Sequence, residues 1–244
     1  MAFYTDLSEV YDALFPVSAA QRSFFDGILR DGWVSRVADA GCGPGAQLLH
    51  FASAGIPCIG FDPDAALVAS ARRRLAPYPD ARVAVGGFAD TVRLVMPAVD
   101  LVLCLGNSLV HVPQDEVRRF LADAASVTSP AGGVLVQILN YERHLRDSVT
   151  ELPLLRAQDG AIELRRRYDW ESPRKIRFRT ALRVARGDEP LTVRNDIPLY
   201  PIYPDELWEM LAAAGFPRIR YHGDFAGSEF TPQSEALVCL ARKA

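Results

Sequence analysis

The sequence has few of the features that mark disulfide-rich, metal-binding or membrane proteins. Its 244 residues include four cysteines, widely separated and without a CxxC pair. This spacing argues against a disulfide framework or a zinc site, so we expect no metal and a reduced, cytoplasmic compartment. No apolar run approaches the roughly 20 residues that a membrane helix needs. The acidic start "MAFYTDLSEVYD" also lacks the character of a secretory signal.

The chain also lacks a strong charge of either sign. Its formal net charge is −3, which is too mild to indicate a nucleic-acid surface or an acidic tail. Hydrophobic residues make up 49% of the chain, enough for the core of one large domain. We therefore expect a small-molecule partner, with no nucleic acid and no membrane, and we leave a homo-oligomer open.

Short apolar runs alternate with helix-like segments over the first 140 residues. Flanking Gly, Pro or Asp residues indicate buried strands at 36–40, 57–61, 81–85, 99–105 and 132–139. Apolar residues at helical spacing indicate helices at 46–55, 64–75 and 114–127. Strand and helix in alternation predict a mostly parallel sheet with helices on both faces, in a Rossmann-like, doubly wound α/β fold.

The pattern changes after residue 150. Segments 161–170 and 175–184 alternate with a period of two, and "RGDEP" (186–190) turns the chain into another strand. This predicts an antiparallel sheet of at least three strands. A helix at 205–214 and strands near 217–222 and 236–241 then resume the first pattern. We predict a single domain over 1–244, with a core at 18–149 and 203–244. A β-rich insertion at 150–202 would form a lid or a subunit contact.

The glycines that follow the first strand predict a ligand site. Gly41, Gly43 and Gly45 let the chain turn sharply before a helix, and Asp62 ends the second strand nineteen positions beyond Gly43. A carboxylate at that place can accept both hydroxyls of a ribose, so the ligand is an adenosine derivative. The spacing also satisfies the G-x-G-x-x-A form of the dinucleotide fingerprint, which keeps NAD as an alternative. However, Asp39 would repel a pyrophosphate and attract a cationic ligand.

The run "DAGCGPG" resembles the first motif, D-x-G-C-G-x-G, of class I S-adenosylmethionine-dependent methyltransferases. The resemblance extends from the first strand to about residue 142 and implies S-adenosyl-L-methionine as the cofactor. Many relatives have Gly-Asp where this chain has Gly86-Gly87, and Asp90 is the candidate replacement for that acid. The resemblance implies these cofactor contacts: Asp39, Gly41, Cys42, Gly43 and Gly45 at the methionine part, Asp62 at the ribose, and Phe88 and Ala89 at the adenine.

Three further segments, "CLGNSLVHV" (104–112), "LNYERH" (139–144) and "YPDELWEMLAAAGF" (203–216), resemble glycine N-methyltransferases and their bacterial glycine/sarcosine relatives. The family's carboxylate-binding Arg is Leu139 in this chain, so glycine is expected to be a poor acceptor. Arg143 or Arg146 could compensate from nearby. The resemblance implies that Leu105 lies against the cofactor, and that the substrate contacts are Asn107, Asn140, Tyr141 and Tyr203.

Two residues are predicted to be catalytic. His111 follows the fourth strand, where ligands bind in open α/β sheets, and amino-sugar N-methyltransferases that resemble this chain also have a His near this position. A base there would remove the acceptor's proton and give an acid limb near neutral pH. Tyr11, like Tyr4, lies in an N-terminal segment that folds over the cofactor in similar enzymes. Alternatively, His111 is a hydrogen-bonded loop histidine, and the segment with Tyr11 forms a hydrophobic staple.

These observations predict an S-adenosylmethionine-dependent methyltransferase that acts on a small molecule, with N-methylation of an amine as the first choice. O- or C-methylation is the nearest alternative, because the cofactor motifs do not distinguish acceptors. An NAD-dependent oxidoreductase and a non-catalytic S-adenosylmethionine-binding protein rank lower. The basic strand residues 165–167 indicate a solvated sheet face or, as a second reading, a place for an anionic substrate.

Overall fold

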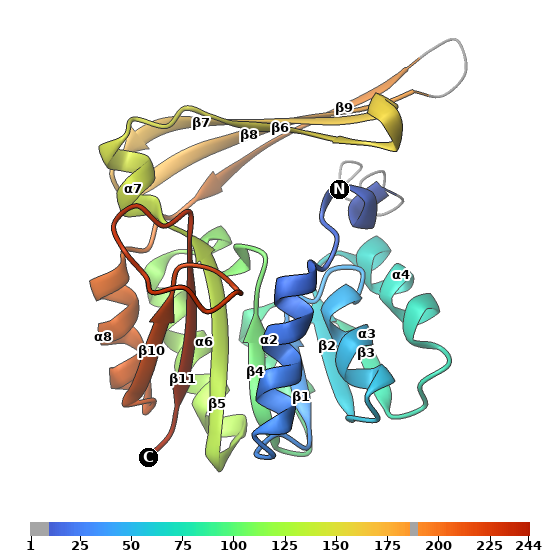
Figure 1. Ribbon diagram of the computed structural model, residues 1–244, viewed down its shortest axis with the longest axis vertical. Coiled ribbons are helices and arrows are strands. Elements are labelled where there is room, and N and C mark those ends of the chain that lie inside the picture. Colours follow the sequence, from blue (N-terminus) through green and yellow to red (C-terminus); the bar gives the residue numbers. More distant parts are fainter. Residues whose placement is uncertain (1–9, 186–189) are drawn as a thin grey trace.

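The computed structural model describes residues 10–185 and 190–244, so Tyr4 and most of the turn at 186–190 lie outside the described residues. A seven-stranded sheet forms the centre of the molecule, in the order β3-β2-β1-β4-β5-β11-β10 (Figure 1). Only β11 runs antiparallel to its neighbours. The strands are β1 (Val37–Ala40), β2 (Cys58–Asp62), β3 (Ala81–Val85), β4 (Val99–Cys104), β5 (Thr128–Leu139), β10 (Arg218–His222) and β11 (Ala236–Arg242).

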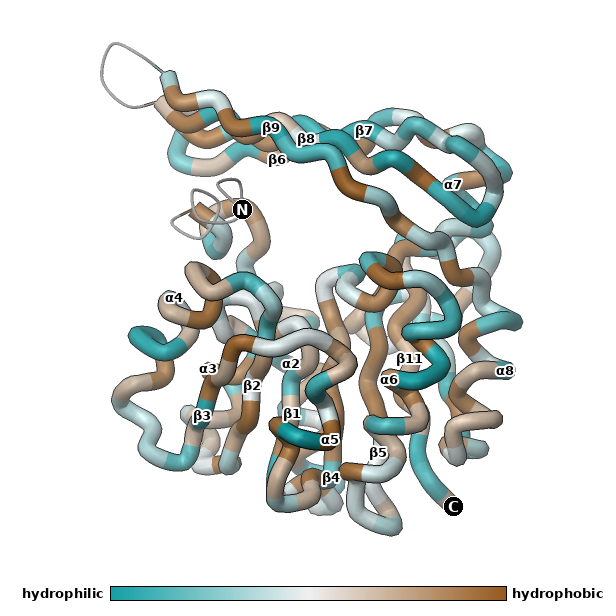
Figure 2. The backbone as a smooth tube through the Cα atoms, turned by 180° about the vertical axis from the view of Figure 1, so that it is seen from behind, coloured by the Kyte–Doolittle hydropathy of each residue, from teal (hydrophilic) through white to brown (hydrophobic). Residues whose placement is uncertain are grey.

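The strand order reverses between β1 and β4, which is where open α/β sheets bind ligands. Each central strand buries both of its faces: Leu101 and Leu103 of β4 pack toward one helical layer, and Val102 packs toward the other. This two-sided burial explains the continuous apolar runs in the sequence, which Figure 2 shows as hydrophobic colour along the central strands. The expected doubly wound α/β fold is confirmed.

Helices cover both faces of this sheet. The helices α2 (Ala19–Arg30) and α3 (Ala46–Ser53) pack on one face, and α6 (Gln114–Val127) and α8 (Pro204–Ala214) pack on the other. The remaining helices are α4 (Ala65–Leu75), α5 (Thr91–Leu94) and α7 (Tyr141–Arg146). None of the helices in the described part of the chain is long and apolar enough to cross a membrane.

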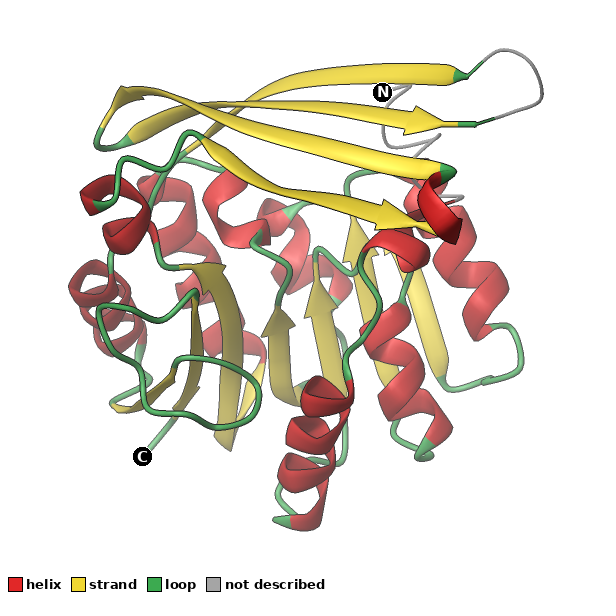
Figure 3. Ribbon diagram, turned by 45° about the horizontal axis from the view of Figure 1, so that its top comes forward, coloured by secondary structure: helices red, strands yellow, loops and turns green. Residues whose placement is uncertain are grey.

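A separate antiparallel sheet, here called the roof sheet, is formed by β6 (Glu151–Ala157), β7 (Ile162–Ser172), β8 (Lys175–Val184) and β9 (Leu191–Leu199) in that order. Figure 3 shows it lying across the carboxyl ends of the parallel strands. Its first strand, β6, was not expected from the sequence. Pro153 interrupts the apolar alternation in β6, and the pairing register shifts between Leu152 and Leu155.

Contacts at both ends attach the roof sheet to the rest of the molecule. Residues 10–14 are helical, and Val10 and Leu14 form a buried apolar cluster with Leu164 and Leu182 of the sheet. At the other end, the Tyr200 amide after β9 donates to the Val110 carbonyl at 2.8 Å. The roof sheet is therefore held above the loops that follow β1 and β4.

Candidate active site

A cavity of about 560 Å³ lies at the carboxyl ends of the first four strands, below the roof sheet. It brings together seven of the residues predicted from the sequence: Tyr11, Gly41, Gly43, Asp62, Phe88, Ala89 and His111. A larger groove of about 840 Å³ runs between α2 and β10. That groove contains none of the predicted site residues, so the smaller cavity is the candidate active site.

The glycine loop after β1 has a conformation that only glycine adopts readily. Gly41, Gly43 and Gly45 have φ angles of 80°, 51° and 79°. A Cβ atom on Gly41 would also lie 2.9 Å from Ser108 Oγ, in the loop that follows β4. The loop therefore needs glycine both for its backbone and for its close approach to the neighbouring strand end.

The backbone amides of this loop are already used within the chain. Gly41 and Cys42 donate to the Phe61 carbonyl at 2.8 and 3.0 Å. The Gly43 amide donates to Asp62 Oδ2 at 3.0 Å. A pyrophosphate needs free amides at such a turn, so this geometry argues against the dinucleotide alternative.

Asp39 is a buried carboxylate beneath the loop. Its side chain is 2% exposed and accepts no hydrogen bond from the residues that the structure describes. Burial, with a smaller contribution from the Asp62 charge, raises the pKa of Asp39 to about 8. A cationic group beside it would restore its ionised form, so Asp39 marks a place for positive charge.

Asp62 connects the glycine loop to the start of α4. Its two oxygens accept from the Gly43 amide and, at 2.9 Å, from the Asp64 amide. Burial raises its pKa, and these two backbone donors partly oppose that rise. Asp64 in turn caps α4 by accepting from Ala66 and Leu67 at 2.8 and 3.0 Å. The Asp62 carboxylate is thus fixed in direction at the edge of the cavity.

The side of the cavity near β3 contains an aromatic ring. Phe88 packs on Phe120 of α6, with ring centroids 4.4 Å apart. Asp90 does not line the cavity; its carboxylate accepts from the Gly87 amide at 3.0 Å and pairs with Arg93 at 2.6 Å. Glu116, one helical turn before Phe120, lines the cavity instead.

His111 lies at the end of the short helical turn Ser108–His111 and lines the cavity. His111 is exposed to the open cavity, and desolvation by the protein around it lowers the pKa of His111 to about 4. The imidazole makes no hydrogen bond with the part of the chain that the structure describes. It is therefore neutral at physiological pH and has a nitrogen available to accept a proton or a hydrogen bond.

Two of the expected substrate-binding side chains form a network behind the cavity. Asn107 adopts a left-handed backbone conformation with φ 68°. Its side chain donates to Tyr141 Oη at 2.7 Å and accepts from the Leu139 amide at 3.0 Å. Tyr141 is fully buried and is also hydrogen-bonded to Tyr168 of the roof sheet. The network ties the loop after β4 to the end of β5.

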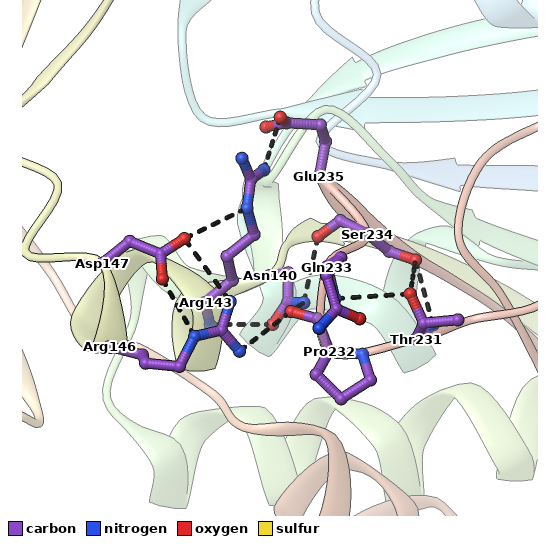
Figure 4. Close-up of polar contacts among 9 residues, drawn as sticks. All are labelled: Asn140, Arg143, Arg146, Asp147, Thr231, Pro232, Gln233, Ser234 and Glu235. Atoms are coloured by element: carbon purple, nitrogen blue, oxygen red, sulfur yellow. Dashed lines mark hydrogen bonds and ion pairs between the residues drawn. The ribbon is translucent and has the colours of Figure 1, made fainter.

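Asn140, Arg143 and Arg146 lie in another polar network, shown in Figure 4. Asn140 caps α7 and donates to the Pro232 and Ser234 carbonyls. Arg143 pairs with Asp147 and Glu235, and Arg146 binds Asp147 and the Pro232 carbonyl. Neither arginine lines the cavity, so neither replaces the missing carboxylate clamp there.

Five other predicted residues are also absent from the cavity lining, and the buried Asp39 is one of them. Cys42 and Leu105 are buried in the apolar core. Gly45 faces α4, where an added Cβ atom would lie 3.1 Å from that of Ala71. The Tyr203 hydroxyl donates to the Pro173 carbonyl. The assigned ligand contacts of these residues stay predictions.

The cavity also contains residues that the sequence did not reveal. Ile197 and Pro198 of β9 line it from the roof sheet, and Glu116 lines it from α6. Glu116 could have been found as an acid in the first turn of the helix after β4. Ile197 and Pro198 carry no such signal, because their position depends on how the roof sheet folds over the strand ends.

Comparisons with known proteins agree with this geometry. Residues 37–132 match the family model described as a methyltransferase domain. The glycine/sarcosine N-methyltransferase of Aphanothece halophytica is 22% identical over 228 residues, which cover 93% of this chain and 83% of that protein.

Solved structures resemble the chain over almost its whole length. An S-adenosylmethionine-dependent methyltransferase from Clostridium acetobutylicum has a TM-score of 0.82 at 13% identity, covering 99% of both chains. CalS10, an amino pentose methyltransferase from Micromonospora echinaspora solved with S-adenosylmethionine bound, has a TM-score of 0.70 at 21% identity. It covers 96% of this chain and 97% of its own. At these identities the likeness establishes the fold, including the roof sheet.

The hydrogen bonds of Asn107 predict that its replacement affects stability more than substrate affinity. Asn107→Ala removes both bonds and leaves a non-glycine residue at φ 68°. Asn107→Gly removes the same bonds but tolerates the backbone. We expect both variants to lose roughly 1–3 kcal/mol per lost bond in urea unfolding, with the larger loss for Ala. An unchanged unfolding free energy together with a raised acceptor KM would instead place Asn107 at the substrate.

Proposed function

We propose that this S-adenosylmethionine-dependent methyltransferase transfers a methyl group to the nitrogen of a small amine. The observation that carries the proposal is the neutral, unpaired imidazole of His111 in the same cavity as the glycine loop and Asp62. Among the relatives, the glycine/sarcosine N-methyltransferase acts on amines by its name, and CalS10 is an amino pentose methyltransferase. These names support an amine acceptor.

The cavity fits S-adenosylmethionine. The unpaired carboxylate of Asp39 would face the ligand's cationic amino-acid part, and the bare backbone at Gly41 and Gly43 leaves room for it. Asp62 would accept the ribose hydroxyls, because each of its oxygens keeps a second lone pair beside its backbone bond. Phe88 would lie against the adenine. When bound, the cofactor supplies an activated methyl group on a cationic sulfur.

Methyl transfer from a sulfonium is an in-line displacement, so the protein contributes mainly alignment. The attacking nitrogen must be neutral and must direct its lone pair at the methyl carbon. The neutral imidazole of His111 can accept a hydrogen bond from an amine N–H and so orient that lone pair.

The basicity of His111 favours an amine over a hydroxyl acceptor. A group with a pKa of about 4 is a weak base. It cannot remove the proton of an aliphatic hydroxyl, which would have to ionise before attack, whereas an amine needs only to arrive in its neutral form. The same argument disfavours C-methylation, which requires a carbanion.

The charges that line the cavity support the same choice. The ionisable side chains of its lining, within the described residues, are Tyr11, Asp62, Asp64, His111 and Glu116, with no Lys or Arg. Carboxylates raise the local concentration of a cationic amine and give no anchor to a carboxylate or phosphate next to the reacting nitrogen. The roof sheet, through Ile197 and Pro198, would act as a lid that excludes water.

A panel of primary and secondary amines, offered with S-adenosylmethionine, tests the function. We expect S-adenosylhomocysteine together with a product about 14 Da heavier, whose fragmentation places the methyl group on nitrogen. Glycine and sarcosine should stay below about 10⁴ M⁻¹s⁻¹ in kcat/KM, because Leu139 cannot bind their carboxylate. Transfer to oxygen or carbon alone would contradict the proposal, and efficient use of glycine would show that another residue binds its carboxylate.

The position of His111 predicts a loss of turnover without a loss of cofactor affinity. His111→Ala should lower kcat by roughly 10²–10⁴, while the dissociation constant of S-adenosylhomocysteine stays nearly unchanged. His111→Gln should retain more activity because its amide oxygen can still accept an N–H. In the pH–rate profile, the fall in rate at low pH that is due to His111 should occur near pH 4 and not near neutral pH. The reason is that only the protonated ring has no nitrogen that can accept a hydrogen bond.

His222→Ala serves as the control, because His222 lies on β10 outside the cavity. It should leave kcat unchanged. If His111→Ala instead weakened S-adenosylhomocysteine binding and spared kcat at saturation, His111 would be a cofactor ligand and the proposed role would be wrong.

The raised pKa of Asp39 predicts that cofactor binding releases a proton. Below about pH 8 the free enzyme holds Asp39 mostly protonated, and the ligand's ammonium group stabilises the ionised form. The affinity for S-adenosylhomocysteine should therefore rise with pH, by at most about tenfold per unit, and level off near pH 8. Calorimetry in two buffers of different ionisation enthalpy measures the released proton. Asp39→Asn should bind more weakly and lose this pH dependence; a pH-independent wild type would contradict the assignment.

A further inference from the structure

A row of polar side chains crosses the roof sheet on the face that looks toward the parallel strand ends. Arg166 of β7 pairs directly with Thr180 of β8, and Thr180 pairs with Asn195 of β9. Directly paired residues in antiparallel strands point to the same side of the sheet. Arg166 lies between the buried Leu164 and Tyr168 at i ± 2, so it shares their inner face.

Apolar rows on both sides of this polar row border the cavity. On one side, Leu164 and Leu182 pack against Leu14, three residues after Tyr11, which lines the cavity. On the other side, Phe178 pairs with Ile197, which lines the cavity itself. The polar row therefore lies between two apolar rows that reach the cavity, although none of its three residues is part of the cavity lining.

Two polar atoms of this row are buried without a partner among the described residues: Arg166 Nε and Thr180 Oγ1. Arg166 makes one hydrogen bond, from Nη2 to the Pro153 carbonyl at 3.0 Å, and no described carboxylate pairs with it. Arg166 is half-buried, and a half-buried guanidinium without a counter-charge is unfavourable. Such a group points to a ligand that completes it.

Some arginines on the opposite face of the same sheet are paired. Arg167 pairs with Asp169 at 2.7 Å, and Arg179 pairs with Asp169 and Asp196 at 2.8 and 3.3 Å. Arg165, Arg183 and Arg194 have no ion pair with the described residues, but they are exposed to water. Arg166 differs from them because it is partly buried and its Nε atom is fully buried.

We propose that Arg166, with Thr180 and Asn195, binds an anionic oxygen group of the methyl acceptor, either a carboxylate or a phosphate, at a distance from the reacting amine. The guanidinium donates two N–H groups in a planar fork that matches such a group, and the hydroxyl and amide add further bonds. This inference rests on the proposed N-methylation and specifies its substrate as an amine with a remote negative charge.

The dimensions of the sheet separate this anchor from the reaction centre. Neighbouring strands lie about 4.8 Å apart, so Arg166 on β7 lies on the order of 10 Å from β9, whose Ile197 lines the cavity. The carboxylate of glycine, two bonds from its nitrogen, is too close to the amine to reach Arg166. Leu139 cannot bind a carboxylate next to the reacting amine, and Arg166 has no ion pair with the described residues. Both observations fit an acceptor whose anionic group lies farther from its amine.

Three probes that differ only at one end test the anchor: 6-aminohexanoate, 6-aminohexyl phosphate and 6-amino-1-hexanol. Their dissociation constants are measured by calorimetry on the S-adenosylhomocysteine complex of the wild type, and their KM and kcat with S-adenosylmethionine. We expect at least one anionic probe to bind roughly tenfold or more tightly than the alcohol. The anionic probe with the lower dissociation constant identifies the group as a carboxylate or a phosphate.

Arg166→Gln should abolish this preference by weakening only the anionic probes, through KM more than kcat. Arg165→Gln is the matched control, because Arg165 is the adjacent residue on the exposed outer face, and it should keep the preference. Thr180→Val, which removes one hydroxyl without a change of shape, should weaken the anionic probes more modestly. Arg166→Gln should also raise the unfolding temperature of the ligand-free enzyme, because it removes an uncompensated, half-buried charge.

The anchor is overturned if the wild type shows no preference for either anionic probe, or if Arg166→Gln keeps the preference. These results are distinct from a failure of the proposed function. If all three probes were methylated at equal rates, the proposed N-methylation would be supported and the proposed anion anchor at Arg166 would be wrong. Anion preference in binding without methylation of any amine would keep the anchor and reject N-methylation.

Discussion

The site is organised around a carboxylate that the chain buries and does not neutralise. Asp39 is the last residue but one of the first strand, lies under the glycine loop, and receives neither an ion pair nor a hydrogen bond from the described residues. A buried carboxyl group without a partner reduces stability when ionised, so the free protein holds it protonated near neutral pH. We propose that a cationic ligand supplies the stabilisation. This requirement explains why the loop above Asp39 is bare backbone and why its amides point away from the ligand.

The roof sheet complements this arrangement. The parallel strand ends supply acids and His111, whereas the roof supplies apolar contacts from Ile197 and the half-buried Arg166, which has no ion pair with the described residues. The two halves are joined by the apolar cluster around Leu14 and by the buried Tyr141–Tyr168 contact. On this account the cofactor's positive charge is bound below, and the acceptor's negative charge is bound above. Methyl transfer takes place between them, beside a neutral imidazole.

The sequence predicted the fold well, because the fold depends on local patterns. Of the predicted cofactor residues, Gly41, Gly43 and Asp62 line the cavity with Phe88 and Ala89, whereas Asp39, Cys42, Gly45 and Leu105 do not. Alternating strands and helices, the glycine turn and Asp62 nineteen residues later are all properties of short segments. The acceptor side was harder to predict. Asn107 and Tyr141 bond to each other instead of facing the cavity, and Asp90 is occupied by Arg93. Arg166 was one of a run of three arginines, and only the pairing register showed that it alone faces inward.

The most direct test of the account is the titration of Asp39 by carboxyl ¹³C NMR, in the free protein and in the complex with S-adenosylhomocysteine. The account predicts a pKa of about 8 in the free protein, raised by burial. It predicts a fall of at least about two units in the complex, because the ligand's ammonium group compensates the charge. A pKa that stays near 8 in the complex, or one near the ordinary aspartate value in the free protein, would contradict it.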